Sequence, residues 1–401
     1  MPDRFRGSKA QPIALVNGQI ALPDRVLDEG VVTVENGKIA AICTLDELAD
    51  HIVRVDVGGR LISPGLVDIH IHGATGHSFN EASESAFAAI TQANGEAGVT
   101  SLLATTATDS IEKLVECLAC ARRWMASPRA GAQLLGVHVE GPYFALSQAG
   151  AQDPAHLRRP DDGTPARLLA FHDVIKILTF APELPGAVAL TRDLVRLGIV
   201  PAAGHSNATE EEIAPCLEAG LSHFIHIWSG QSSTVREGPW RKPGLLEVTL
   251  TADNISAEMI SDGKHLPATL MKLAYKCLGP DRLCAISDAT SGAGLSQGAR
   301  FRMGGMEYEV HDGVGMLLDR SAFAGSTTLL NAMLPILTQV ANIPLAEAIR
   351  MASLTPARVI GVADRKGSLA PGKDADIAIF DADFRTWRVM IGGEWVRGKL
   401  Q

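Results

Sequence analysis

Four histidines and two carboxylic acids stand at the ends of short apolar runs, in positions where their side chains could bind a metal. They are His70 and His72 in LVDIHIH, Glu140 in HVEGP, His205 in AGHSN, His226 in IHIW and Asp288 in ISDAT. Imidazoles mixed with carboxylates suit zinc or iron(II), whereas magnesium and calcium prefer ligands that are all oxygen. The set therefore predicts a site for one or two divalent ions.

The two histidines of LVDIHIH are separated by one residue. Alternate residues of a strand point to the same side, so His70 and His72 can share one ion. A lone His-x-His pair is explained equally well by ordinary core packing. Burying all six polar side chains in one apolar barrel would be costly, however, unless a metal or mutual pairing stabilised them. The whole set favours a metal site.

Residues 61–365 alternate short apolar runs with helical stretches, which indicates repeated βα units and a parallel sheet. We predict eight strands in this part: LVDIHIH, TSLLATT, LLGVHVE, VIKILTFAPE, IVPAAGH, HFIHIW, ISAEMISD and RLCAISD. Eight is the number that a TIM (β/α)8 barrel requires, and the barrel brings the carboxyl ends of its strands to one face. The predicted fold class is therefore α/β, with the candidate ligands gathered at that face.

The two ends of the chain have a different sequence pattern. Residues 1–60 and 366–401 carry β-type runs separated by turn signals such as Asn-Gly and Gly-Gly, which are typical of small antiparallel sheets. We expect both ends to build one small β-sandwich domain, with the catalytic barrel of residues 61–365 inserted between them.

The composition narrows the classes of function. The formal net charge of -9 opposes nucleic-acid binding, which needs a basic surface. No apolar run approaches the length needed to span a bilayer, and the 6 cysteines are scattered rather than arranged as a disulfide framework. We expect a cytoplasmic enzyme with a small-molecule substrate and no nucleic-acid or membrane partner.

Several motifs together resemble the N-acetylglucosamine-6-phosphate deacetylase family of the amidohydrolase superfamily: HVEGP, AGHSNAT, SDGKH, SDAT, TPARVIG and GSLAPGKDADIAIFD. The resemblance covers most of the chain. It implies a TIM barrel, a small β domain built from both termini, and a homodimer. It also implies hydrolysis of an N-acetylhexosamine 6-phosphate, in the gluco or galacto form, to acetate and the amino sugar phosphate.

The resemblance also implies a role for each candidate ligand. Glu140, His205 and His226 would hold the main metal, whereas His70 and His72 mark members that bind a second ion. Asp288, itself a candidate ligand, would act with metal-activated hydroxide as general base and then as general acid, because the departing amine must be protonated.

Four residues are candidates for substrate binding by their place in the family's motifs. His265 in SDGKH matches a phosphate-contacting histidine, and Gln152 stands where many members carry a histidine that polarises the carbonyl. Ser229 and Gly230 replace an Asn-Ala pair that contacts the sugar phosphate. This exchange predicts a changed pocket.

Two arginines are further candidates for substrate binding. Arg236 and Arg241 lie in SGQSSTVREGPWRKPG, a stretch rich in Gly, Ser and Pro that is typical of a functional loop. The family's phosphate arginine precedes a Pro-Gly and often reaches across the dimer. RKPG offers Arg241 and REGP offers Arg236, and either is a candidate because an arginine fork suits phosphate.

Three other functions compete with this hypothesis. A different N-acyl sugar is compatible with the same chemistry. Hydrolysis of a cyclic amide would favour a carbamylated lysine at the end of the fourth strand, but Lys176 lies near the start of that strand. An inactive barrel that binds sugar phosphate as a regulator would have no need to retain Asp288.

Overall fold

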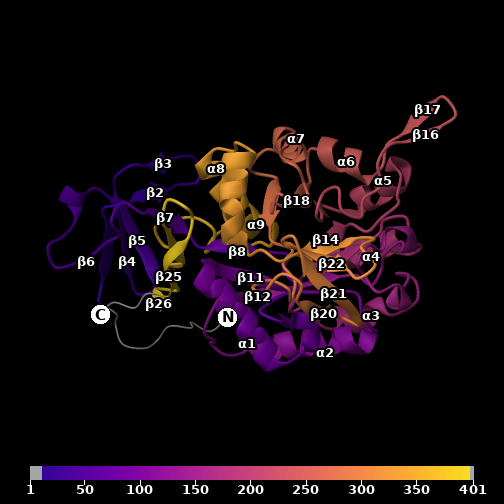
Figure 1. Ribbon diagram of the computed structural model, residues 1–401, viewed down its shortest axis with the longest axis horizontal. Helices are drawn as coiled ribbons and strands as arrows, with labels where there is room; N and C mark the ends of the chain where they lie inside the picture. The colour runs from indigo at the N-terminus through magenta and orange to yellow at the C-terminus, as the bar shows by residue number, and fades with distance from the viewer. Residues whose placement is uncertain (1–10, 398–401) are drawn as a thin grey trace.

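The computed structural model describes residues 11–397, and a parallel eight-stranded sheet forms its centre (Figure 1). The hydrogen-bonded order of the strands is β19-β18-β15-β14-β13-β12-β11-β8. Their bounds are β8 (Leu66–Asp68), β11 (Val99–Thr106), β12 (Gln133–Glu140), β13 (Ile175–Phe180), β14 (Val200–Ala203), β15 (His223–Phe224), β18 (Ser256–Ile260) and β19 (Leu283–Ile286).

The first and last strands meet just beyond their carboxyl ends. A parallel bridge joins Ile71 to Ala289, and the Asp288 amide donates a 2.9 Å hydrogen bond to the His70 carbonyl oxygen. These contacts close the sheet into a barrel. The predicted fold, a TIM barrel with a small β-sandwich built from both ends of the chain, is therefore confirmed.

Helices cover the outside of the barrel, so its strands are buried on both faces and read as nearly continuous apolar runs. All of β11 is buried. The helix that follows it is capped at its N-terminus by Ser110, whose side chain accepts a hydrogen bond from the Lys113 amide. The helices are α1 (Glu84–Ala97), α2 (Ile111–Met125), α3 (Pro165–Leu169), α4 (Ala187–Arg196), α5 (Glu210–Ala219), α6 (Leu245–Thr251), α7 (Ala268–Leu278), α8 (Leu345–Met351) and α9 (Leu354–Val359).

The small β-sandwich lies beside the barrel, at the left of Figure 1, where indigo and yellow strands come together. One sheet contains β5 (Lys38–Cys43), β4 (Val31–Glu35), β1 (Ile13–Val16) and β6 (Val53–Asp56). The other contains β26 (Glu394–Arg397), β25 (Thr386–Ile391), β24 (Ile377–Phe380), β7 (Leu61–Pro64), β2 (Gln19–Ala21) and β3 (Val26–Leu27). Strand β7 belongs to this sheet by its pairings, so the boundary expected at residue 60 falls just before a strand of the sandwich.

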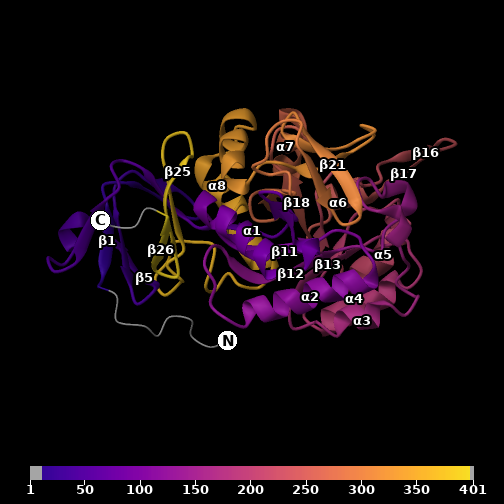
Figure 2. The ribbon, with the colours of Figure 1, turned by 60° about the horizontal axis from the view of Figure 1, so that its bottom comes forward.

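Both sheets of the sandwich are mixed, but a separate, fully antiparallel sheet follows β19 and was not predicted from the sequence. It contains β20 (Arg300–Met303), β21 (Met306–His311), β22 (Val314–Leu317) and β23 (Phe323–Ser326). In Figure 2 this sheet, labelled at β21, stands over the barrel. It therefore adds a wall at the barrel face where the candidate ligands lie.

Two short hairpins complete the fold. One pairs β9 (Gly73–Ala74) with β10 (His77–Ser78), and the other pairs β16 (Val235–Glu237) with β17 (Trp240–Lys242). The β16–β17 hairpin projects from the body of the protein in both Figure 1 and Figure 2. None of the helices in residues 11–397 is both long enough and apolar enough to cross a membrane.

Candidate active site

The six candidate ligands lie together at the carboxyl ends of the barrel strands. Glu140 is the last residue of β12, and the others follow β8, β14, β15 and β19 within a few residues. All six are buried. Five of them line a pocket of about 230 Å³, and His70 lies behind it with no exposed surface. The barrel geometry thus brings together residues that are more than 200 positions apart in the sequence.

Three of the six have backbone conformations that are unusual for residues other than glycine. The φ angles are +46° at His205, +23° at His226 and +46° at Asp288. Such left-handed backbone is strained and is found preferentially at functional sites. Here these three residues stand where the backbone turns away from a barrel strand, and their side chains line the pocket.

Glu140 is the centre of the cluster. Its Oε1 lies 3.1 Å from His205 Nε2 and 3.0 Å from His226 Nε2, while its Oε2 lies 3.2 Å from His72 Nε2. One carboxylate therefore faces three imidazoles. Glu140, His205 and His226 can offer ligand atoms that all lie within 4.8 Å of one another, and so can Glu140, His70 and His72.

In two of the imidazoles, the hydrogen bond made by Nδ1 determines which atom Nε2 can bind. His205 Nδ1 lies 2.8 Å from the Gln148 carbonyl oxygen, and His226 Nδ1 lies 3.0 Å from that of Ser229. A carbonyl only accepts, so each Nδ1 carries a hydrogen, and each ring in its neutral form presents a bare Nε2 lone pair to Glu140. Lone pairs that face a carboxylate oxygen need a cation between them, which fits a divalent metal.

Asp288 closes the opposite side of the cluster. Its Oδ1 lies 3.3 Å from His72 Nε2 and 3.5 Å from His70 Nε2. Within residues 11–397, the buried His70 Nε2 and His72 Nδ1 make no hydrogen bond. Unpaired buried nitrogens are costly in the absence of a ligand. The donor set therefore fits one or two ions such as zinc or iron(II).

The ionisation of the cluster follows from these contacts. Burial alone would raise the pKa of Glu140, but the nearby imidazoles outweigh it and hold that pKa well below its usual value. The same balance, with His72 as main partner, lowers the pKa of Asp288. Burial would lower the pKa of His72, yet hydrogen bonds with Asp288 and Glu140 raise it to about 9. The site thus stabilises positive charge between its carboxylates.

Gln152 and His265 also line the pocket. Gln152 donates a 2.7 Å hydrogen bond from Nε2 to Glu140 Oε2 and accepts one of the same length from the Thr108 amide. His265 Nδ1 lies 2.7 Å from Asp262 Oδ2, which fixes the ring so that its other nitrogen is free for a ligand. The pocket also includes the predicted substrate residues Ser229 and Gly230.

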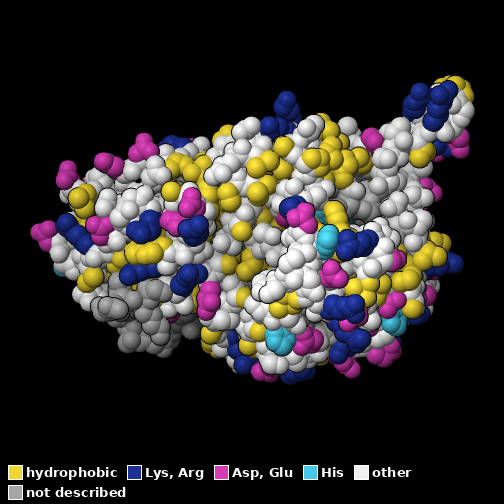
Figure 3. Space-filling view, viewed as in Figure 1, with side chains coloured by type: hydrophobic (Ala, Val, Ile, Leu, Met, Phe, Trp, Pro, Cys, Tyr) yellow, Lys and Arg dark blue, Asp and Glu magenta, His cyan; other side chains and the backbone are white. Residues whose placement is uncertain are grey.

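The two candidate arginines lie elsewhere. Arg236 and Arg241 are paired across the β16–β17 hairpin, and the basic side chains there form the dark blue group on the projection in Figure 3. Both are exposed, and in the described chain their hydrogen bonds go to the Gly238 and Pro239 carbonyls. No lysine or arginine of residues 11–397 lines the pocket. Neither arginine therefore reaches the pocket of its own chain.

Several residues of the site were missed by the sequence reasoning. The inserted sheet adds Met303 and Phe323 to the pocket lining. Glu258, in the interior of the barrel, hydrogen bonds to His70, and His223 hydrogen bonds to Glu258 in turn. A glutamate in the middle of the apolar strand ISAEMISD was the available signal, because an acid there needs a partner.

The fourth barrel strand offers no lysine to the site. Its carboxyl end is Phe180, and Lys176 stands near its start, as expected from the sequence. A carbamylated lysine therefore has no place among the ligands, which removes the main structural reason to consider cyclic-amide hydrolysis.

The fold and the site together define a class of protein: a hydrolase built on a (β/α)8 barrel, with histidines and carboxylates suited to a metal at the strand ends. A model of the amidohydrolase family matches residues 61–396, and a model of the NagA composite domain matches residues 13–62. The chain therefore belongs to the amidohydrolase family, whose enzymes depend on metal.

Individual relatives agree with this assignment. The chain is 31% identical to the N-acetylglucosamine-6-phosphate deacetylase of Bacillus subtilis (strain 168), over 93% of this chain and 94% of that protein. It is 29% identical to the N-acetylgalactosamine-6-phosphate deacetylase of Escherichia coli O157:H7, over 93% of this chain and 95% of that protein. A solved mutant N-acetyl-D-glucosamine-6-phosphate deacetylase from Mycobacterium smegmatis, in complex with N-acetyl-D-glucosamine-6-phosphate, has a TM-score of 0.89 and 28% identity, covering 97% of this chain and 100% of that chain. The predicted family resemblance is confirmed.

Proposed function

We propose that the protein hydrolyses the N-acetyl amide of an N-acetylhexosamine 6-phosphate, releasing acetate and the amino sugar phosphate. The observation that carries this proposal is the convergence of three imidazoles on Glu140, with Asp288 beside them in the same small pocket. This arrangement provides metal ligands and a proton carrier at one place.

A divalent ion held by Glu140, His205 and His226 would lower the pKa of water and polarise the acyl oxygen. Asp288 carries the proton. Because its pKa is lowered, Asp288 is a carboxylate at neutral pH and can accept a proton from the attacking water. It then returns this proton to the departing nitrogen. Gln152, which is anchored to Glu140, orients the acyl group at the pocket wall.

The sugar phosphate needs partners beyond the arginines and lysines of one chain, because the pocket's own lining contains no arginine or lysine from the described residues. His265 supplies one partner for the phosphate. The other is an arginine from a second copy, since the β16–β17 hairpin projects with Trp240 74% exposed and Val235 54% exposed. An isolated two-stranded ribbon is only marginally stable, which favours a homodimer in which the hairpin packs on the partner.

The test is a deacetylation assay on N-acetylglucosamine and N-acetylgalactosamine, each with and without the 6-phosphate, using protein loaded with zinc or iron(II). Relatives named for the two epimers are 31% and 29% identical to this chain, so both sugars belong in the assay. We expect acetate release with a strong preference for the phosphorylated sugars. Equal turnover without phosphate would reject the phosphate assignment. No turnover by metal-loaded protein would support the inactive regulator.

A further inference from the structure

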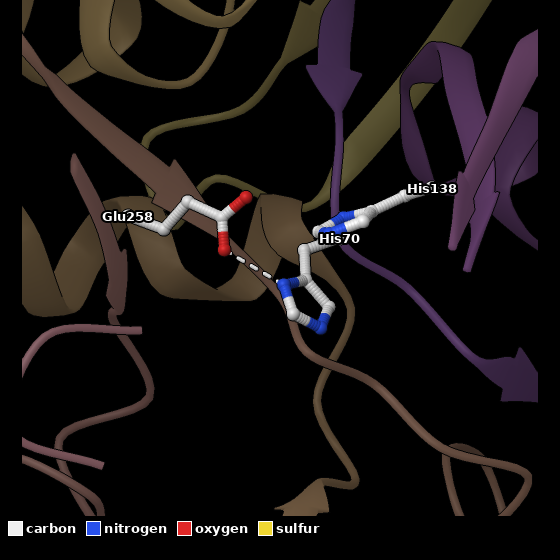
Figure 4. A group of neighbouring side chains, drawn as sticks. All are labelled: His70, His138 and Glu258. Atoms are coloured by element: carbon white, nitrogen blue, oxygen red, sulfur yellow. Dashed lines mark hydrogen bonds and ion pairs between the residues drawn. The ribbon is translucent and has the colours of Figure 1, made fainter. Parts of the chain in front are cut away.

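His70, His138 and Glu258 form a buried polar group in the barrel interior, behind the pocket (Figure 4). All three have no exposed surface. In Figure 4 the Glu258 carboxylate points at one nitrogen of His70, while His138 lies beside His70 without an interaction drawn to either residue. The mechanism above does not use this group, and an acid buried in an apolar strand requires an explanation.

The group is not itself a third metal site. His138 has both ring nitrogens occupied, by the Ile69 carbonyl oxygen at 3.1 Å and by Thr179 Oγ1 at 2.7 Å. Glu258 also has both oxygens occupied, by His70 Nδ1 at 2.7 Å and by His223 Nε2 at 3.0 Å. The potential ligand atoms of His138 and Glu258 are therefore already satisfied. Separately from His138, hydrogen bonds connect His223 to Glu258 and Glu258 to His70.

Glu258 sets the direction of these hydrogen bonds. A carboxylate only accepts, so both imidazoles must donate to it, His70 from Nδ1 and His223 from Nε2. His223 is held from its other side by Ser256 Oγ, 2.7 Å from its Nδ1. His70 in its neutral form then has a bare Nε2, which lies 3.5 Å from Asp288 Oδ1 and 3.7 Å from Glu140 Oε1.

His205 and His226, which also lie beside Glu140, have their Nδ1 hydrogens fixed by a different kind of acceptor. The Nδ1 groups of His205 and His226 donate to backbone carbonyls of nearby loops, whereas only His70 donates to a charged side chain. A carboxylate behind a ligating imidazole fixes the ring, selects its tautomer and raises its basicity. His70 is thus the imidazole whose state depends on one replaceable side chain.

We infer that Glu258, anchored by His223, is a positioning residue that holds His70 as a ligand for the second cation position expected at His70 and His72 beside Glu140 and Asp288. This inference rests on the proposed metal-dependent function. Glu258 contacts the imidazole of His70 at 2.7 Å, its other contact with a ligand residue is a longer 3.4 Å hydrogen bond from the His226 backbone amide, and it does not touch the substrate. Its removal should therefore weaken the second cation far more than the first, which Glu140, His205 and His226 hold.

The test measures cation binding rather than activity. Metal-free protein is titrated with Co²⁺, and the visible absorption and bound metal per chain are recorded for wild type, Glu258→Leu, Glu258→Gln and His138→Gln. We expect two equivalents in wild type and about 100-fold weaker binding of the second in Glu258→Leu. Glutamine can accept from only one imidazole, so Glu258→Gln should weaken the second equivalent about tenfold.

His138→Gln is the matched control, because His138 is equally buried beside His70, with ring centroids 4.6 Å apart, but does not hydrogen bond to it. It should bind both cations as wild type does. Circular dichroism melting shows whether each variant folds, and if Glu258→Leu does not fold, Glu258→Gln decides. The inference is overturned if wild type binds one equivalent, or if the Glu258 variants bind the second with unchanged affinity. Two bound cations without deacetylation would instead refute the proposed function alone.

Discussion

Replacing Asp288 with asparagine separates proton transfer from metal binding. Asparagine keeps the size and an oxygen acceptor of the side chain but cannot accept a proton at neutral pH. Glu140, His205 and His226 do not depend on Asp288 for their contacts with one another, so Asp288→Asn should still bind at least one cation per chain. The substitution therefore tests the chemical step itself.

The expected loss follows from the two tasks that Asp288 performs. General acid–base catalysis contributes about 10²–10⁴-fold, and one residue that serves both steps belongs at the upper end of that range. A loss of about 10⁴-fold in kcat corresponds to about 5.4 kcal/mol in the activation barrier. KM should change by less than about threefold, because the interaction is made mainly in the transition state.

The assay is steady-state acetate release from the preferred substrate, with bound metal measured on the same sample. Asp262→Asn is the matched control, since Asp262 is a second buried acid at a strand end but contacts His265 instead of the ligand cluster. The control should raise KM for the phosphorylated sugar and retain most of kcat. If Asp288→Asn retains a tenth or more of wild-type kcat with its metal bound, Asp288 is not the proton carrier.

Three other outcomes are expected. Gly230→Ala should weaken metal binding about 10-fold to 100-fold in a metal titration, because a Cβ there would lie 2.9 Å from His205 Nδ1 in backbone with φ +59°. Gly238→Ala has the same φ but open space, so it should bind metal normally, and similar binding by both variants would count against the argument. Arg236→Gln or Arg241→Gln should raise KM about 10-fold to 100-fold for phosphorylated sugars only, as the loss of a charge-assisted hydrogen bond predicts. An unchanged KM in both variants would show that the hairpin does not bind the phosphate. Zinc at 100 times its Kd should add about 2.7 kcal/mol to the free energy of unfolding and raise Tm by a few degrees over chelated protein, whereas a Tm indifferent to zinc would contradict a site formed by the fold.

The barrel could be predicted because its signal is local and repeated. Each βα unit shows its own apolar run and helix, and β8 to β19 match the eight predicted strands in order. The gathering of Glu140 and Asp288 then follows from barrel geometry. Their roles, the homodimer and the cytoplasmic location stay predictions.

The features that the sequence did not predict depend on contacts between segments that are distant in the chain. Glu258 is one acid in an apolar strand, and only the folded barrel shows that His70 and His223 lie on either side of it. The inserted β20–β23 sheet had turn signals in MGGM and HDGV, but an antiparallel sheet does not belong to the βα repeat. The distance of Arg241 from the pocket likewise cannot be read from its neighbours in the sequence.

The pairing of β7 with β24 has a consequence for synthesis on the ribosome. The two strands are separated by roughly 300 residues, which at ~5–20 residues per second take roughly 15 to 60 seconds to make. During that interval the N-terminal strands have an unpaired edge at β7, and such edges are prone to wrong pairing. A nascent chain stalled before residue 377 should therefore bind chaperones through the exposed edge of β7, even when its barrel segments have begun to fold.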